Sequence, residues 1–209
     1  MARSRIEDVE RPLDTLRPED PADTSSEIRK MSGLESVRGK LYDGLWLQRI
    51  FHKALAERAP EEIDGAFIHM VFTGRLFGTY GDRRYHARVV LTGSPTLIST
   101  SGLVEAPARP REYYFIKGGL LRSGGDLSEL DTMYKGRFVE YDDPRTTSIM
   151  FSYALQAVYY ELSGNDFCED PGCCLYNSHW QEEVLRLQFE GNMCEKCLEA
   201  FKEIAGKDK

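Results

Sequence analysis

The chain has 209 residues, of which 41% are hydrophobic and 29% charged, so it is long enough to bury a sizeable core. Its formal net charge of −7 argues against broad electrostatic binding to nucleic acid or to an anionic membrane. No segment approaches the roughly 18 apolar residues of a membrane helix, and the first residues contain no apolar stretch typical of a secretory signal. We therefore expect a cytoplasmic protein without membrane segments, whose thiols stay reduced.

The first part of the chain, residues 1–34, combines mixed charge with three prolines and little apolar periodicity. Such composition is typical of a solvated extension. We interpret it as a flexible N-terminal tail, and residues 35–209 as one domain.

The next part of the chain contains patterns of both regular structures. Apolar residues at helical spacing predict a helix over residues 40–58. Three segments rich in β-branched and aromatic residues predict strands over 66–72, 84–93 and 96–103.

Two segments then lack a clear pattern. Residues 106–116 contain prolines, which favour an irregular start followed by extended backbone. Residues 118–130 contain four glycines and are interpreted as a loop.

The most hydrophobic segment, residues 146–164, has almost no polar face, which predicts a helix buried on all sides. Gly164 is suited to end this helix, because glycine readily adopts the left-handed conformation. Strands grouped before this helix favour an α+β fold, with a mixed sheet and a buried central helix.

All five cysteines lie within residues 168–197. Four form two short-spaced pairs, Cys168 with Cys173 and Cys194 with Cys197, and each pair can supply one edge of a tetrahedral ligand set. Four thiolates are a ligand set that Zn²⁺ prefers in structural sites. We therefore predict one structural zinc ion bound by these residues, with Cys174 as an alternative to Cys173.

A zinc ion closed by four thiolates keeps no open coordination position, so this site is not expected to catalyse a reaction. Its expected role is to stabilise a C-terminal segment that has little core of its own.

The layout around these cysteines resembles the archaemetzincins, zinc peptidases of the metzincin clan. In that family a helix carrying H-E-x-x-H-x-x-G-x-x-H leads into a cysteine, a second cysteine follows four residues later, and a C-x-x-C pair completes a structural zinc site. Here a helix leads through Gly164 to Cys168, Cys173 follows, and Cys194 and Cys197 complete the set. The resemblance covers roughly residues 66–200 and implies a metzincin-like mixed sheet.

The catalytic motif of that family is missing here. In the frame set by Gly164, the two motif histidines fall at Ala157 and Glu161, the glutamate at Val158, and the third histidine at Phe167. A catalytic zinc ion needs three protein ligands and a general base, which these residues do not provide. The resemblance therefore implies a pseudoenzyme.

The chain as a whole is also similar to an archaeal family that is labelled as metallopeptidases. Five phrases carry this similarity: VRGKLYDGLWLQRIF, FTGRLFGTYGDRRYHARVV, ISTSGLVEAPARPREYY, FVEYDDPR and NSHWQEE. This kinship implies a metzincin-like fold and leaves activity open.

A second, nonstandard site is one alternative. His179 and Glu183 would share a helix face, and with Glu161 they could form a metal or acid–base site. The simpler interpretation is that His179 packs on the cysteine loop while the glutamates face water.

These observations lead to a zinc-binding, archaemetzincin-like protein that is catalytically inactive and acts as a protein-binding or assembly component. The first alternative is a zinc metallopeptidase or hydrolase that uses Glu161 and His179. The second is a ribosome- or RNA-associated factor that uses basic strand segments, which the acidic net charge disfavours.

Overall fold

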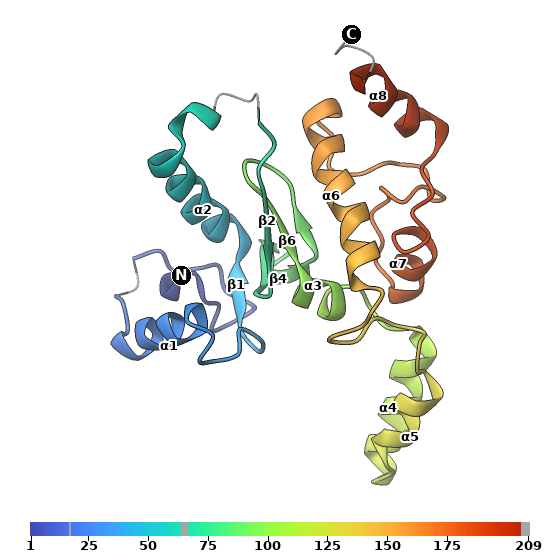
Figure 1. The fold of residues 1–209 in the computed structure, drawn as a ribbon. Coiled ribbons are helices and arrows are strands. Elements are labelled where there is room, and N and C mark those ends of the chain that lie inside the picture. The colour runs from blue at the N-terminus through green and yellow to red at the C-terminus, as the bar shows by residue number, and fades with distance from the viewer. Residues whose placement is uncertain (17, 64–66, 206–209) are drawn as a thin grey trace. The chain divides into compact units, whose positions relative to one another are not determined.

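The structure, a computed structural model, describes residues 1–16, 18–63 and 67–205 (Figure 1). The chain divides into two compact units, Met1–Ala106 and Pro107–Lys209. We call them the N-terminal unit and the C-terminal unit. This division differs from the predicted tail and single domain.

The N-terminal unit contains all of the strands in the described part of the chain, together with three α-helices. Its elements are η1 (Ala2–Ser4), α1 (Pro21–Met31), β1 (Leu41–Asp43), α2 (Gly44–Arg58), η2 (Pro60–Glu62), β2 (Met70–Thr73), β3 (Leu76–Gly81), β4 (Arg84–Arg88), β5 (Val90–Leu91), β6 (Thr96–Ser99) and α3 (Thr100–Glu105).

The strands form two small mixed sheets rather than one. The first has the order β1-β3-β4, in which β1 is parallel to β3 and β3 is antiparallel to β4. Asp82 and Arg83 connect β3 and β4 with positive φ angles of 50° and 65°, as a tight type I′ hairpin requires. The second sheet has the order β2-β6-β5, with β2 parallel and β5 antiparallel to β6. The predicted α+β class is confirmed, and so is the mixture of parallel and antiparallel strand pairs.

The predicted helix over residues 40–58 is confirmed as α2, although its first residues belong to β1. The Asp43 carboxylate accepts a hydrogen bond from the Trp46 amide at 2.7 Å and so caps the helix. Leu47 of α2 is fully buried and packs with Phe77 of β3 and Leu97 of β6. Burial of this apolar face holds the helix against the strands.

The predicted strands are confirmed in part. The first, over 66–72, begins at Met70, and residue 66 lies outside the described residues. The segment 84–93 forms β4 and the short β5. The expected strand over 96–103 is correct only as far as Ser99, whose hydroxyl accepts a hydrogen bond from the Gly102 amide at 2.7 Å. This cap starts α3 and ends the strand.

Gly102 lies against the backbone of Arg88, and a Cβ at this position would be 2.2 Å from the Arg88 carbonyl oxygen. We expect Gly102→Ala to lower the free energy of unfolding by about 1–3 kcal/mol, because the backbone must move to relieve the overlap. Urea denaturation measures the change. Gly81→Ala is the control, since a Cβ there meets nothing within 4 Å. A Gly102→Ala chain as stable as the Gly81→Ala chain would contradict this packing.

Residues 1–34, predicted as an exposed tail, are instead part of the N-terminal unit. The amide of Ile6 donates a hydrogen bond to the Leu41 carbonyl at 2.8 Å. The side chains of Arg5, Glu27 and Lys30 are buried. The tail prediction failed because this segment is fixed by buried charge pairs, which sequence periodicity does not reveal.

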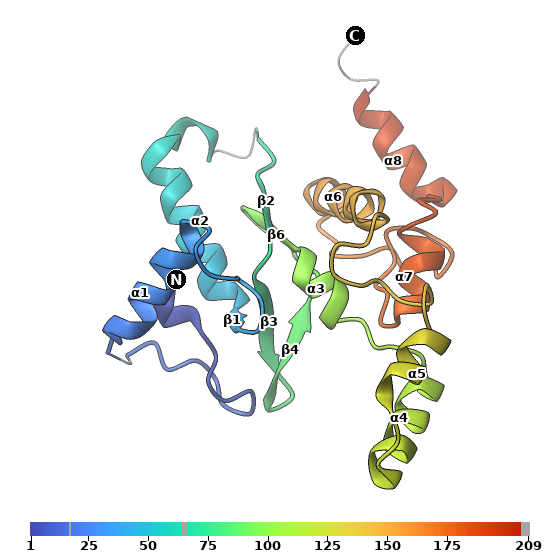
Figure 2. The same ribbon diagram turned by 60° about the horizontal axis from the view of Figure 1, so that its bottom comes forward.

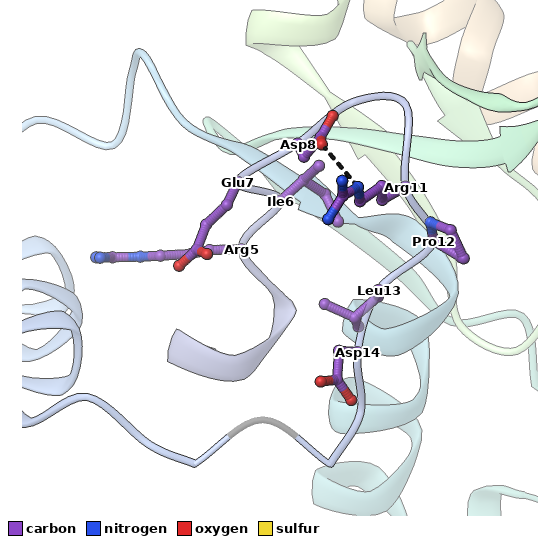
Figure 3. A pocket seen from close by; sticks show the side chains of 8 residues that line it. All are labelled: Arg5, Ile6, Glu7, Asp8, Arg11, Pro12, Leu13 and Asp14. Carbon is purple, nitrogen blue, oxygen red and sulfur yellow. Dashed lines mark ion pairs between the residues drawn. The ribbon is translucent and has the colours of Figure 1, made fainter.

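The segment from Arg5 to Asp14 borders a cavity of about 190 Å³ (Figure 3). Asp8 and Arg11 on its rim form an ion pair at 3.3 Å. Drug-sized ligands occupy cavities of about 300–1,000 Å³, so this cavity is too small for such a ligand.

The C-terminal unit contains no named strand among its described residues. Its elements are α4 (Arg111–Ser123), α5 (Leu127–Met133), α6 (Thr146–Ser163), α7 (Gln181–Leu187) and α8 (Glu195–Ala205).

The irregular start predicted for residues 106–116 is correct as far as Pro110, but the extended backbone predicted after it and the loop predicted over 118–130 are both wrong. From Arg111 onward the chain forms α4 and then α5, which lie side by side (Figures 1 and 2). Tyr113 of α4 and Leu130 of α5 pack in one apolar cluster with Tyr134 and Phe138. This packing outweighs the low helix propensity of the glycines.

The predicted helix over 146–164 is confirmed as α6, and it ends at Gly164 with φ of +69°. Ile149 and Ala157 are fully buried. Phe151 is 65% exposed, so the expectation of burial on all sides is wrong. In the described residues we find no helix that combines the length and apolarity needed to cross a membrane.

Candidate metal centre

Four cysteines meet where two segments of the C-terminal unit approach each other. Cys168 follows the end of α6, and its amide donates to the Leu175 carbonyl at 2.9 Å. Cys173 lies in the turn between Cys168 and Leu175, and its amide donates to the Asp170 carbonyl at 3.0 Å. Cys194 directly precedes α8, and Cys197 lies in its first turn.

The four sulfur atoms all lie within 4.8 Å of one another. The Sγ atoms of Cys168 and Cys194 are 3.7 Å apart. A tetrahedral zinc site with Zn–S bonds of about 2.3 Å requires sulfurs separated by about 3.8 Å. The spacing of the sulfurs therefore fits a tetrahedral metal ion.

Burial and hydrogen bonding set the charge state of this cluster. Burial raises the pKa of the Cys168 and Cys197 thiols, which disfavours several thiolates without a cation. Burial acts in the same direction on Cys194, but hydrogen bonds from the Cys197 backbone and from neighbouring thiols lower its pKa overall. The amide of Asp170 donates to the Cys168 sulfur at 3.4 Å, and the amide of Cys194 donates to the Cys173 sulfur at 3.5 Å. Such amides offset part of the negative charge of bound thiolates.

Cys174 is not one of the four converging residues. Its side chain is fully buried, and burial raises the pKa of its thiol to about 11. Its amide donates to the Asn192 carbonyl at 2.7 Å. Of the two alternatives that the sequence left open, the structure therefore brings Cys173 to the cluster.

Gln188, at the end of α7, fixes the loop of residues 168–176, which we call the cysteine loop, from within. Sequence reasoning did not find this residue. Its side-chain amide donates to the carbonyls of Cys174 and Tyr176, both at 3.0 Å. Its side-chain oxygen accepts from Ser178 at 2.8 Å, and its carbonyl accepts from Ser152 of α6 at 2.7 Å. Gln188 is fully buried, so these bonds are shielded from water. A glutamine at a helix end gives no sequence signal for this role.

Comparison with known proteins supplies the family. The profile of the probable metallopeptidase family (DUF6775) matches residues 1–204. The chain belongs to this family. No curated protein and no solved structure matches the chain.

The histidines and the motif positions of a metallopeptidase do not form a second metal-binding group among the described residues of this family member. In the frame of the peptidase motif, Ala157 is fully buried and Glu161 is exposed. The ring nitrogens of His52, His69 and His86 lie near the carbonyl oxygens of three different segments, those of Ser94, Glu62 and Gly81 respectively. Within the described residues, the four cysteines are the one group of three or more metal-ligating side chains.

The candidates for a nonstandard site have separate roles. Glu183 accepts hydrogen bonds from the amides of His179, at 2.8 Å, and Trp180, at 3.1 Å, and so caps the start of α7. His179 is exposed, and its carbonyl accepts from the Ala108 amide at 2.8 Å. Glu161 lies on the exposed side of α6. The contacts of Glu183 therefore favour a structural role in this member of the probable metallopeptidase family.

Proposed function

We propose that this member of the probable metallopeptidase family binds one structural zinc ion through Cys168, Cys173, Cys194 and Cys197. The observation that carries the proposal is the convergence of the four sulfur atoms within 4.8 Å. Thiolates are soft ligands, which favour zinc over magnesium or calcium. Bound here, zinc supplies positive charge that stabilises four thiolates in a largely buried site.

The position of the cluster supports a stabilising role. Tyr159 of α6, Leu175 of the cysteine loop and Phe201 of α8 pack in the same apolar cluster as the cysteines. This cluster is small, so a metal ion adds a restraint that the apolar contacts alone do not provide. The four ligands hold α8 and the cysteine loop together.

We further propose that the chain has a metzincin-like ancestry but is not an active peptidase. Ala157, Val158 and Phe167 occupy the positions at which the peptidase motif requires two histidines and the general base. Alanine, valine and phenylalanine neither bind zinc nor accept a proton. The chain would then act in the cytoplasm as a binding or assembly component for a protein partner, where a reducing environment keeps the thiols available.

The test is metal analysis of the purified protein and of two sets of variants. We expect one zinc ion per chain, unchanged in Glu161→Ala and Glu183→Ala and lost in Cys173→Ser. Glu183→Ala should lower the free energy of unfolding by about 1 kcal/mol, because α7 loses its N-terminal cap. A second zinc ion, removed by Glu161→Ala or Glu183→Ala, would instead support a hydrolase.

A further inference from the structure

The four cysteines of the metal centre differ in how far solvent reaches them. Cys173 and Cys197 are fully buried, and Cys168 is 5% exposed. Cys194 is partly exposed. An open hollow in the surface of the C-terminal unit is lined by Cys168 and Cys194 and by neither of the other two cysteines. A small molecule in this hollow therefore meets one edge of the ligand set, the edge between Cys168 and Cys194.

Charge on the rim of this hollow favours one kind of oxidant. The residues that line it include three acidic ones, Glu169, Asp170 and Glu195, and the basic Lys196. A rim with more negative than positive charge repels anions and has little effect on uncharged molecules. Hydrogen peroxide is small and uncharged, whereas oxidised glutathione carries net negative charge. The hollow is therefore suited to a peroxide.

The two sulfur atoms that line the hollow are close to each other. The Sγ atoms of Cys168 and Cys194 are 3.7 Å apart. A disulfide bond has an S–S distance of about 2.05 Å, so the two atoms need to approach by roughly 1.7 Å. Cys168 follows the end of α6 and Cys194 precedes α8. The approach therefore requires movement of loop residues rather than of a helix.

We propose that Cys168 and Cys194 form a redox site, which a peroxide oxidises to a disulfide and so deprives the metal ion of two ligands. This inference rests on the zinc site proposed above. It assigns to that site a reaction with a defined pair of its cysteines.

The reaction has two steps. First the Cys194 thiolate attacks one oxygen of hydrogen peroxide, the O–O bond breaks, and the hydroxide that leaves takes up a proton to form water. The Cys168 thiolate then attacks the sulfenic acid at Cys194, an S–S bond forms, and the S–O bond breaks with release of a second hydroxide, which is protonated in turn. Two thiolates together lose two electrons, and hydrogen peroxide with two protons becomes two water molecules.

This disulfide differs in its effect from one within either short-spaced pair. It joins the cysteine loop to the segment before α8, the same two segments that the four ligands hold together. Cys173 and Cys197 remain as two thiolates, which hold a metal ion far more weakly than four do. The oxidised chain therefore loses its metal but keeps α8 attached. A disulfide between Cys194 and Cys197 would instead leave α8 without a link to the cysteine loop.

Oxidation of the zinc-loaded full chain with hydrogen peroxide tests the proposal. A chromogenic chelator measures the zinc released, and mass spectrometry of the alkylated and digested protein identifies the disulfide. We expect one zinc ion released for each disulfide between Cys168 and Cys194, and recovery of zinc binding after reduction with dithiothreitol. Cys174→Ser is the control and should release zinc at the same rate, because Cys174 lies outside the cluster. Zinc that stays bound in excess peroxide, or a disulfide within one short-spaced pair, would overturn the proposal.

Limited proteolysis provides a second readout, which separates this proposal from the zinc site itself. The oxidised chain should be cleaved in α8 at least about tenfold more slowly than reduced chain whose metal has been removed by a chelator. Equal cleavage of the two forms would show that the disulfide does not hold α8 in place. A chain purified without zinc would contradict the zinc site, and the disulfide that peroxide forms in that chain would still decide whether Cys168 and Cys194 are the reactive pair.

Oxidised glutathione tests the role of the charged rim. At low salt and equal concentration, it should release zinc at least about tenfold more slowly than hydrogen peroxide. The double variant Glu169→Gln with Glu195→Gln should narrow this difference, because it removes two negative charges from the rim. A difference that the two substitutions leave unchanged would contradict the selection of a neutral oxidant by charge.

Discussion

Cys197→Ser should abolish metal binding and unfold the cysteine loop and α8. Cys197 is fully buried among the other three thiols. Serine in its place removes a thiolate, and the remaining three sulfurs would bind zinc far more weakly. Because metal-binding free energy in such sites is also folding free energy, we expect a loss of at least about 3 kcal/mol. Zinc content and urea denaturation, measured on the same preparation, give the two readouts.

Cys174→Ser is the matched control, since Cys174 is equally buried but lies outside the cluster. It should retain one metal ion and lose only about 1–2 kcal/mol, the cost of placing a hydroxyl in an apolar site. Equal loss of metal in both variants, or full metal content in Cys197→Ser, would contradict the assignment of ligands.

Glu27→Gln should strongly destabilise the N-terminal unit. The Glu27 carboxylate accepts from Arg5 at 2.6 and 2.8 Å, from Tyr42 at 2.6 Å and from Arg75 at 3.0 Å, and lies 3.7 Å from the Lys30 ammonium. An amide leaves these buried cations without their shared counterion. We expect a loss of about 3–5 kcal/mol, measured by urea denaturation at neutral pH.

The same carboxylate gives the stability of this unit an acid dependence. Burial alone would raise the pKa of Glu27, but hydrogen bonds from Tyr42, Arg5 and Arg75 outweigh it and lower the pKa to about 2. A lowered folded-state pKa contributes stability that is complete above the unfolded value of 4.5. This contribution should decline as the pH falls from there towards 2, and the decline should be smaller in Glu27→Gln.

The surface variant Glu57→Gln serves as the control for both measurements. Glu57 pairs only loosely with Lys53 at 3.8 Å, and both side chains are exposed. Its removal should change stability by less than about 0.5 kcal/mol. If Glu57→Gln and Glu27→Gln had similar effects, the buried network would not be the source of stability.

The sequence was sufficient to predict the elements that depend on local signals. The helix α6 combines a long apolar segment with a terminal glycine, and in the structure this segment is helical and ends at that glycine. The spacing of the cysteines likewise predicted that four thiols meet. The two members of a short-spaced pair lie close together whatever the rest of the fold is. The choice between Cys173 and Cys174 depends on which of the two side chains the turn directs toward the cluster, and the sequence does not show this direction.

Other elements depend on contacts between distant residues, which the sequence does not display. Arg5 and Glu27 look like solvent-facing residues in sequence, and only their mutual pairing makes their burial favourable. Helix α4 contains two adjacent glycines and forms because Tyr113 and Leu130 pack together. Helix α3 replaces the end of a predicted strand because the Ser99 hydroxyl caps it.

The separation of the two cysteine pairs along the chain has a consequence for biosynthesis. Residues 1–106 form a compact unit of their own, so we expect this unit to fold while later residues are still being translated. Cys168 and Cys173 emerge well before Cys194 and Cys197 and hold only half of a ligand set. In this order α8 is the last segment to be fixed in the structure. If no metal is bound, we expect the C-terminal segment of a newly made chain to stay unfolded and open to proteases.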